Sequence, residues 1–214
     1  MMTIACILAA YLIGAVPFGL LIARLYGVGD IRAHGSGNIG ATNVARVAGF
    51  KAAVWVYLLD MAKGAAAVLL AMQVSEPLFA RDLFLVAVVL AAILGHMFPV
   101  YLRFKGGKGV NTAFGGIIML MPLETIVAGL VFIAVVVPSR YVSLASIVAA
   151  LALPVTVIVE DLFFATRVPP AYWGLSLAVG VLVPAAHHQN IKRLLAGTES
   201  RFSFSRKSQG DNRG

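Results

Sequence analysis

The stretch Leu90–Met121, LAAILGHMFPVYLRFKGGKGVNTAFGGIIMLM, joins two apolar runs through a short segment rich in glycine and lysine. The runs on either side are typical of membrane-spanning helices, whereas Phe104–Thr112 holds three glycines and two lysines. Such a segment can be a basic loop that orients the protein in a bilayer, or a loop that binds phosphate. Which of the two applies depends on the segments around it.

The composition of the whole chain indicates a membrane protein. Of its 214 residues, 60% are hydrophobic and only 12% are charged, whereas soluble domains carry about 25% charged residues. The mean hydropathy is +0.92. These values predict an all-α integral membrane protein that forms a single membrane domain over residues 1–214.

Charge and cysteine content exclude several other classes. The net charge of +8 is not accompanied by a basic face with interleaved aromatic residues, so no nucleic acid is expected as a partner. The single cysteine, Cys6, rules out a disulfide framework and a cysteine metal cluster. The first apolar run lacks a basic segment before it and is interpreted as a retained transmembrane helix, not a cleaved signal peptide.

Hydropathy predicts seven transmembrane segments, two of them short. Their approximate ranges are 3–23, 52–73, 83–102, 110–121, 123–137, 141–159 and 168–186. The two short segments, 110–121 and 123–137, reach only about 18 and 22 Å at 1.5 Å per residue, less than the ~30 Å of the hydrocarbon layer. Short segments interrupted by glycine are tolerated where they line a cavity.

The distribution of Lys and Arg favours seven segments over six. With the N-terminus outside and the C-terminus in the cytoplasm, fourteen of the seventeen basic residues fall on the cytoplasmic side, as the positive-inside rule requires. A six-span alternative, with one long helix over 110–138, places the basic C-terminal residues outside. The tail 197–214 is polar and is predicted to be poorly ordered.

Three polar, glycine-containing clusters then emerge on the same cytoplasmic side: His34–Arg46, Gly95–Thr112 and His187–Glu199. In the first, glycines let the backbone turn, short polar side chains can form hydrogen bonds, and Arg46 supplies a cation suited to phosphate. In the second, glycines at the start of a helix present unpaired N–H groups beside lysine side chains. The spacing is not that of a Walker A loop. A basic anchoring loop therefore remains an equal alternative for this cluster.

In the third cluster, His187 and Asn190 share a helix face if the last span continues inward. Glu199 is expected to pair with a basic neighbour and not to take part in chemistry. Within a span, Asp60 and Lys63 stand three residues apart and are expected to form a structural ion pair, because an isolated charge there is costly; a proton relay is the alternative. His96 is expected to bond to the backbone freed by Pro99, not to bind a metal.

The three clusters resemble the signature motifs of the PlsY family, the acyl-phosphate-dependent glycerol-3-phosphate acyltransferases of bacteria. The matching stretches are SGNIGATNVAR, GHMFPVYLRFKGGKGVNT and HHQNIKRLLAGTE, which occur in the family's order in a chain of its length. The resemblance implies a seven-helix enzyme of the bacterial cytoplasmic membrane whose active site faces the cytoplasm. Small departures are Asn111, where the family often has a small residue, and His188 after His187.

The family resemblance also implies the reaction and the site. Such enzymes transfer a fatty acyl group from acyl phosphate to the 1-hydroxyl of glycerol 3-phosphate and begin phospholipid synthesis. By motif position, the catalytic residues are Ser36, Arg46, His187 and Asn190. The residues expected to bind substrate and phosphate are Gly37, Asn38, Gly40, Thr42, Asn43, Lys105, Gly106, Gly107, Lys108, Gly109, Thr112 and Ser143.

Acyl phosphate is already an activated donor, so neither a metal nor another cofactor is expected. Two routes for the proton stay open: His187 as general base, or a phosphate oxygen of the substrate as acceptor. The second is preferred because no carboxylate in the sequence stands ready to orient the histidine. The expected partners are the two substrates, membrane lipids and, transiently, a soluble enzyme that produces acyl phosphate. A small transporter or channel for an anionic solute is the alternative, and a membrane phosphatase that acts on the same donor is a third.

Overall fold

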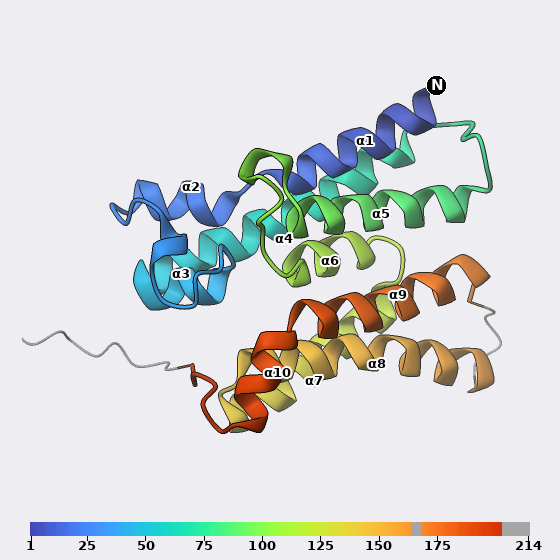
Figure 1. Ribbon diagram of the computed structural model, residues 1–214. Helices are drawn as coiled ribbons and strands as arrows, with labels where there is room; N and C mark the ends of the chain where they lie inside the picture. Colours follow the sequence, from blue (N-terminus) through green and yellow to red (C-terminus); the bar gives the residue numbers. More distant parts are fainter. Residues whose placement is uncertain (164–167, 203–214) are drawn as a thin grey trace, which may run out of the picture.

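Apolar α-helices make up the computed structural model, which describes residues 1–163 and 168–202 (Figure 1). The described part contains no β-strand, because inside a bilayer every backbone N–H and C=O has to find its partner within the chain. The helices are α1 (Met2–Ala15), α2 (Phe18–Leu25), α3 (Ala41–Val47), α4 (Phe50–Met72), α5 (Arg81–Met97), α6 (Val110–Ile117), α7 (Pro122–Ser139), α8 (Val142–Phe163), α9 (Pro170–Ala186) and α10 (His188–Leu195), with single 3₁₀ turns at Ile31–Ala33 and Val100–Leu102.

Five stretches of helix are long and apolar enough to cross a membrane: Met2–Leu25, Phe50–Met72, Arg81–Leu102, Pro122–Ser139 and Val142–Phe163. The prediction of an all-helical membrane protein is therefore confirmed. Helix α9 is apolar but has only 17 residues, and α6 has eight. The seven-span count and the orientation in the membrane stay predictions.

The first predicted span is not one straight helix. It ends at Ala15 and resumes at Phe18 as α2, because Pro17 lacks the N–H that a continuous helix requires. The two short predicted segments also differ from expectation. Helix α6 stops at Ile117, whereas α7 has 18 residues, about 27 Å of helix. Pro122 opens α7 at a position where its missing N–H costs nothing.

Helices α1, α4, α5, α6, α7, α8 and α9 run in alternating directions along the molecule (Figure 1). Helices α1, α4, α5 and α6 pack together, and α7, α8 and α9 form a second group that meets the first through α5 and α9. Within the first group, helices approach very closely. A Cβ on Gly95 would lie 2.1 Å from the Tyr11 carbonyl oxygen, and one on Gly64 would lie 2.2 Å from that of Thr112. Small residues at such contacts are the usual means of packing helices in membranes.

Asp60, Lys63 and His96 are buried inside the first group. The predicted ion pair is confirmed, with 2.8 Å between Lys63 Nζ and an Asp60 oxygen. The expectation for His96 is wrong. Its ring nitrogen Nδ1 lies 2.9 Å from Lys63 Nζ and not against the backbone freed by Pro99, because the buried cation needs acceptors that the membrane interior does not otherwise supply.

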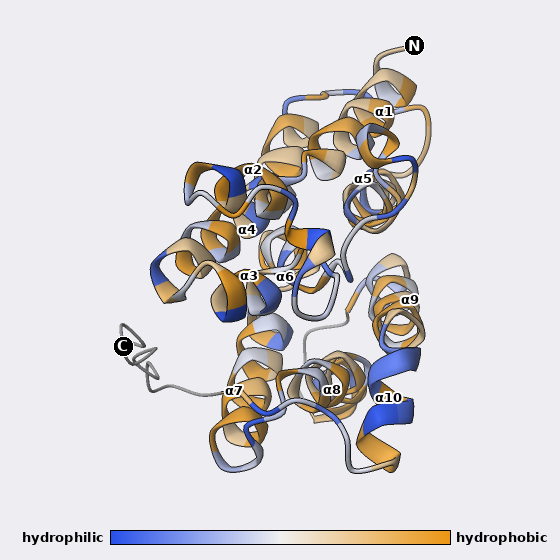
Figure 2. Cartoon of the chain, turned by 60° about the vertical axis from the view of Figure 1, so that its left-hand side comes forward, coloured by the Kyte–Doolittle hydropathy of each residue, from blue (hydrophilic) through white to orange (hydrophobic). Residues whose placement is uncertain are grey.

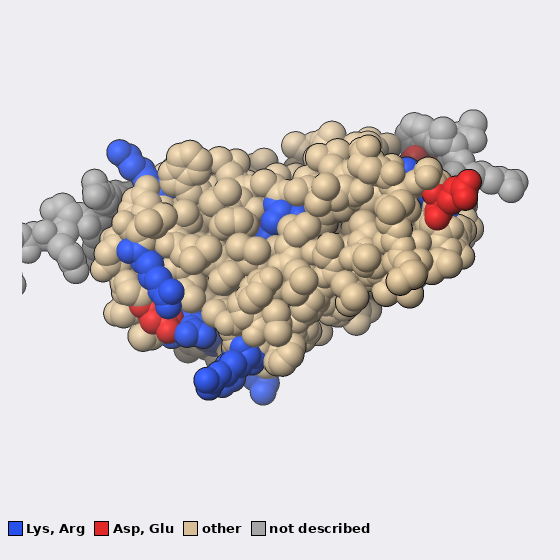
Figure 3. All heavy atoms as spheres, turned by 90° about the horizontal axis from the view of Figure 1, so that it is seen from above, with Lys and Arg blue, Asp and Glu red and all other residues tan. Residues whose placement is uncertain are grey.

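Polar segments gather at one end of the bundle. Helices α2, α3 and α10 lie there (Figure 1), and the strongly hydrophilic residues of α10 stand out against the apolar helices (Figure 2). Most of the Lys and Arg atoms visible in Figure 3 lie toward the end that carries α2 and α3. The bundle thereby brings together three clusters that are far apart in the sequence.

Candidate active site

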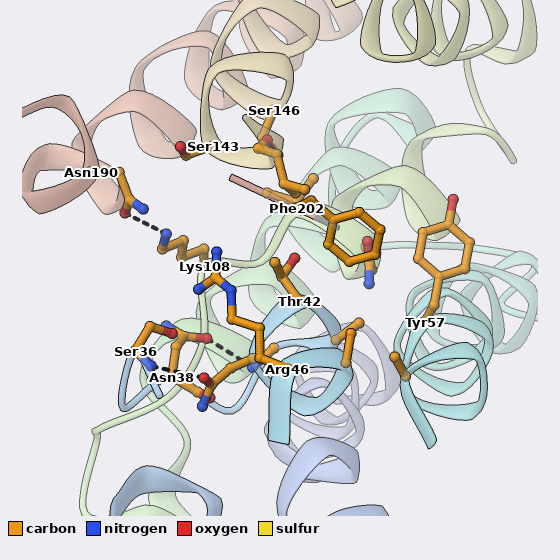
Figure 4. A pocket seen from close by; sticks show the side chains of 18 of the residues that line it. Ser36, Asn38, Thr42, Arg46, Tyr57, Lys108, Ser143, Ser146, Asn190 and Phe202 are labelled. Carbon is orange, nitrogen blue, oxygen red and sulfur yellow. Dashed lines mark hydrogen bonds between the residues drawn. The ribbon is translucent and has the colours of Figure 1, made fainter. Parts of the chain in front are cut away.

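A cavity of about 410 Å³ lies at this end, where α3, the start of α6, α8 and α10 meet (Figure 4). All three polar clusters contribute to its wall. The predicted site residues that line it are Ser36, Asn38, Gly40, Thr42, Asn43, Arg46, Lys108, Gly109, Ser143, His187 and Asn190. The four residues assigned to catalysis by motif position are thus in one cavity, although the sequence separates the first from the last by more than 150 residues.

The remaining predicted site residues are not in its wall: Gly37, Lys105, Gly106, Gly107 and Thr112. Lys105 is exposed. The backbone N–H groups of Gly106 and Gly107 donate to the carbonyls of Met97 and His96, at 3.1 and 3.0 Å, so they are not free to hold phosphate. Thr112 is fully buried against α4, whose Gly64 meets its carbonyl oxygen. The unpaired N–H groups expected of this loop lie instead at the beginning of α6, after Lys108.

The loop before α3 is shaped by Asn43. This buried side chain accepts a hydrogen bond from the Ser36 N–H at 2.8 Å and donates to the carbonyls of Asn38 and His34, at 2.8 and 3.0 Å. Because its polar atoms are used in this way, Asn43 organises the loop. Ser36, by contrast, is exposed at the cavity. Gly35 makes the turn possible, with φ of +59° and no space for a Cβ beside the Asn43 amide oxygen.

A chain of hydrogen bonds connects the second and third clusters. Lys108 Nζ donates to Asn190 Oδ1 at 2.5 Å, and Asn190 Nδ2 donates to Glu199 Oε1 at 2.6 Å. The same carboxylate oxygen accepts from Ser143 Oγ at 2.7 Å. Lys108 and Asn190 are drawn with this bond in Figure 4. Three of these side chains belong to the predicted site, and Glu199 joins them.

Glu199 is a site residue that sequence reasoning missed, and Asp60 and His96 also line the cavity. The Glu199 side chain is 6% exposed and pairs with Arg193 at 2.7 Å, which confirms the predicted pairing with a basic neighbour. It also holds Asn190 and Ser143, and this could not be read from the sequence. Gly197 turns the chain with φ of +68° and directs Glu199 back over α10. The sequence feature that could have indicated this role is a single acidic residue that follows His187 and Asn190 in an otherwise basic segment.

Residues 197–202 also depart from the expected disorder of the tail. Arg46 Nη2 donates to the Ser200 carbonyl at 3.3 Å, and the Phe202 N–H donates to the Arg140 carbonyl at 2.7 Å. Glu199, Ser200 and Phe202 line the cavity, and the labelled Phe202 ring lies between Thr42 and Tyr57 in Figure 4. The rest of the predicted tail, 203–214, lies outside the described residues.

Electrostatics in the cavity favour bound anions and a neutral histidine. Burial lowers the pKa of Lys108 to about 8, although the Glu199 carboxylate opposes this shift. Burial, with a contribution from Lys108, lowers the pKa of His187 to about 4. Burial alone raises the pKa of Glu199, but hydrogen bonds from Asn190, Ser143 and Arg193 outweigh it and hold this pKa below its ordinary value. At neutral pH, Lys108 is therefore mainly charged and His187 is neutral.

The geometry also fixes the tautomer of His187. Its Nδ1 lies 2.7 Å from the Val183 carbonyl oxygen, which can only accept. The proton is therefore on Nδ1, and Nε2 carries a lone pair. A backbone carbonyl orients this ring in place of a carboxylate. Among the described residues, the site included, no group of three His, Cys, Asp or Glu side chains is placed to hold a metal ion.

An apolar cavity of about 480 Å³ adjoins the polar one. It runs between α6, α7, α8 and α9, and Ala113, Phe114, Gly129, Leu153 and Val179 are among its lining residues. The two cavities share the side chains of Tyr57, Val110, Asn111, Phe132 and Ser146. The polar site therefore opens directly into a groove suited to a hydrocarbon chain.

Comparisons with known proteins agree with this architecture. A family model described as glycerol-3-phosphate acyltransferase matches residues 4–197. The glycerol-3-phosphate acyltransferase of Syntrophotalea carbinolica is 48% identical over 196 residues, which cover 92% of this chain and 95% of the relative. That of Neisseria meningitidis serogroup C is 42% identical over 207 residues, 96% of this chain and all of the relative.

Two crystal structures of PlsY, an integral membrane glycerol 3-phosphate acyltransferase, share the fold. The glycerol 3-phosphate form superposes with a TM-score of 0.85 at 39% identity, and the lysophosphatidic acid form with 0.83 at 37%. Each alignment covers 95% of this chain and 96% of the other. With a family model over most of its length and relatives above 40% identity, the chain belongs to the glycerol-3-phosphate acyltransferase family of integral membrane proteins.

Proposed function

We propose that the protein transfers the fatty acyl group of an acyl phosphate to the 1-hydroxyl of glycerol 3-phosphate. The products are lysophosphatidic acid and inorganic phosphate, and the reaction is the first committed step of bacterial phospholipid synthesis. The observation that carries this proposal is the junction of the two cavities. A basic polar site for phosphate groups opens into an apolar groove for an acyl chain, and family membership points to the same pair of ligands.

The polar cavity has the groups that two anionic substrates need. Arg46 and Lys108 both supply positive charge to the cavity, and the start of α6 adds backbone N–H groups whose dipole favours an anion. Ser36 and Asn38 add short polar side chains along the wall. Holding both phosphates in this way would bring the hydroxyl of one substrate to the carbonyl carbon of the other.

The chemical step needs no covalent enzyme intermediate, because acyl phosphate is a mixed anhydride with phosphate as leaving group. The 1-hydroxyl oxygen attacks the carbonyl carbon, a new C–O ester bond forms, and the bond from this carbon to the phosphate oxygen breaks. The hydroxyl proton has to be transferred to an acceptor during this step. His187 is a weak acceptor, since its pKa of about 4 is far from the operating pH.

A phosphate oxygen of the substrate is therefore the better acceptor for this proton. In this route His187 stays neutral, and its Nε2 lone pair can position glycerol 3-phosphate by accepting a hydrogen bond from a hydroxyl other than the attacking one. Lys108 and Arg46 neutralise the negative charge that develops on the oxyanion and on the departing phosphate. No resident metal or cofactor has a step in this scheme.

The bacterial cytoplasmic membrane is the proposed location, with the site facing the cytoplasm. The gathering of Lys and Arg at the end of the bundle that carries α2 and α3 supports this orientation (Figure 3). The same basic end suits transient docking of a soluble, acidic enzyme that delivers acyl phosphate. Such docking should weaken as salt concentration rises, and docking that is indifferent to salt would contradict it.

Turnover by the purified protein in detergent tests the proposed function. Given acyl phosphate and glycerol 3-phosphate, it should release phosphate and lysophosphatidic acid in equal amounts. Phosphate release without glycerol 3-phosphate would indicate a phosphatase, and folded protein without any turnover would refute the transferase. Acyl-CoA as the only donor tests donor choice, and EDTA tests the expectation that no metal is needed.

A further inference from the structure

The buried cation Lys63 stands at the centre of a polar cluster that the proposed reaction does not use. Its Nζ lies 2.8 Å from an Asp60 carboxylate oxygen, 2.9 Å from the Val16 carbonyl and 2.9 Å from His96 Nδ1. The side chains of Asp60, Lys63 and His96 are at most 5% exposed. The Val16 carbonyl and His96 Nδ1 are hydrogen-bond partners of this ammonium group, and the Asp60 carboxylate neutralises its charge at salt-bridge distance.

The cluster ties three helices together at the break in the first span. Val16 precedes Pro17, and its carbonyl accepts from the Phe18 N–H as well as from Lys63. The cation thus joins the turn between α1 and α2 to α4 and to the end of α5. A charge inside the bundle is costly unless it is paired and hydrogen-bonded. This cluster therefore holds the turn, α4 and the end of α5 in fixed relative positions.

Lys63 determines which hydrogen bond the His96 ring makes. An ammonium can only donate, so His96 Nδ1 is the acceptor in this contact. The Asp60 oxygen is 3.6 Å from Nδ1 and too far for a hydrogen bond. The ring is held in one orientation by a single strong donor.

The other side of His96 supports the glycine loop before α6. The Gly107 N–H donates to the His96 carbonyl at 3.0 Å, and a Cβ on Gly107 would lie 2.1 Å from His96 Nε2. A Cβ on Gly106 would lie 2.2 Å from the same carbonyl oxygen. Both glycines therefore rest directly on this residue. The next residue in the chain is Lys108, whose Nζ reaches Asn190 in the polar cavity.

We propose that His96 is a positioning residue for the site. Held by the buried Lys63–Asp60 pair, it fixes the path of Gly106 and Gly107 and thereby places Lys108 against Asn190. This explains why the loop needs two successive glycines although their N–H groups are not free to bind an anion. The inference rests on the proposed acyl transfer, since its effect is read from that reaction.

The principal test is the variant His96→Asn. An asparagine oxygen can still accept from Lys63, so the buried cation keeps a partner, while the ring beneath Gly107 is lost. In the unmodified background we expect kcat/KM to fall about 10-fold, mostly through a higher KM for glycerol 3-phosphate or acyl phosphate. In the Lys108→Met background the same change should cost less than about 2-fold, because the residue through which His96 acts is already gone.

A second cycle approaches the contact from the loop. Gly107→Ala alone should lower kcat/KM about 10-fold, because the added Cβ meets the His96 ring. Added to His96→Asn, it should cost less than about 2-fold, because the obstructing ring is absent. Gly174→Ala is the matched control: this α9 glycine has no atom within 4 Å of its Cβ position, and its substitution should leave kcat/KM unchanged.

The possible results separate the two proposals. Inactive but folded unmodified protein would refute the acyl transfer itself. Equal fold-losses in both backgrounds, or a loss of folded protein with unchanged specific activity in the folded fraction, would show that His96 only stabilises the bundle and would overturn its positioning role. Non-additive losses in both cycles, with thermal unfolding close to that of the unmodified protein, are the result expected.

Discussion

Lys108 Nζ and Asn190 Oδ1 lie 2.5 Å apart, although 82 residues separate them in the sequence. This bond joins the loop before α6 to the short helix α10. Through Asn190 it also links Lys108 to the Glu199 carboxylate. The site is therefore a single hydrogen-bonded unit, and the functional effects of its members should be coupled.

Lys108→Met is expected to lower kcat/KM by about 10- to 100-fold, the size of a lost hydrogen bond to a charged group. The cause is removal of the half-buried cation from the cavity. Lys105→Met, three residues away, should cost less than about 3-fold because Lys105 is exposed and does not line the cavity. Steady-state kinetics of both variants measure these two losses of kcat/KM. Equal losses would support the sequence-based prediction that both lysines bind phosphate.

After correction for the ionisation of the substrate phosphates, whose second pKa is about 6, kcat/KM should have a plateau from about 5 to about 7. Burial lowers the pKa of His187 to about 4, so protonation of this ring reduces activity only as pH falls toward that value. Burial lowers the pKa of Lys108 to about 8, so the cation is lost and activity declines as pH rises through 8.

Lys108→Arg provides the control for the pH profile, because arginine stays charged throughout this range. The alkaline decline should disappear in this variant, whatever its absolute activity. An inflection near pH 6.5 that persists after correction for the ionisation of the substrate phosphates would instead indicate a histidine that titrates at its ordinary pKa.

Glu199→Gln should remove a pH-dependent part of the stability. The hydrogen bonds at Glu199 hold its folded-state pKa below the unfolded value, despite the opposing effect of burial. The carboxylate thus contributes stability above the unfolded pKa, about 4.3, and this contribution is lost as pH falls through the lower folded-state pKa. Thermal unfolding of the two proteins should differ more at pH 7 than at acid pH. A difference that is the same at both would contradict the assignment.

Gly129→Leu should shift the preference for acyl-chain length. Gly129 lines the apolar groove, and a Cβ there makes ordinary contact with the Phe114 ring at 3.4 Å. A leucine would therefore fill groove space and displace the far part of a long chain. We expect kcat/KM to fall about 10-fold for a 16-carbon acyl phosphate and to change little for a 10-carbon one.

Gly174→Leu, on the exposed face of α9, is the matched control for the groove. It should leave the ratio of the two donors unchanged. If Gly129→Leu also leaves this ratio unchanged, the acyl chain occupies another path.

Much of the site could be predicted because the polar clusters interrupt apolar runs, and the charge distribution places them on one side of a membrane. Ser36, Arg46, His187 and Asn190 were identified in this way and through the family motifs, and all four line one cavity. The role of Glu199 could not be predicted, since it depends on a turn at Gly197 that directs one carboxylate to two other helices.

The sequence by itself determined the class of protein, the positions of its apolar segments and the buried pairing of Asp60 with Lys63. These follow from properties of neighbouring residues: a run of about 20 apolar side chains suits the hydrocarbon layer, and two charges one helical turn apart can neutralise each other. Only the tertiary structure decided which loop atoms are available to a substrate. The N–H groups of Gly106 and Gly107 are used by the carbonyls at the end of α5, and His96 faces Lys63 instead of its own backbone. Hydrogen bonds of this kind depend on how separate helices pack, and no local pattern in the sequence predicts that packing.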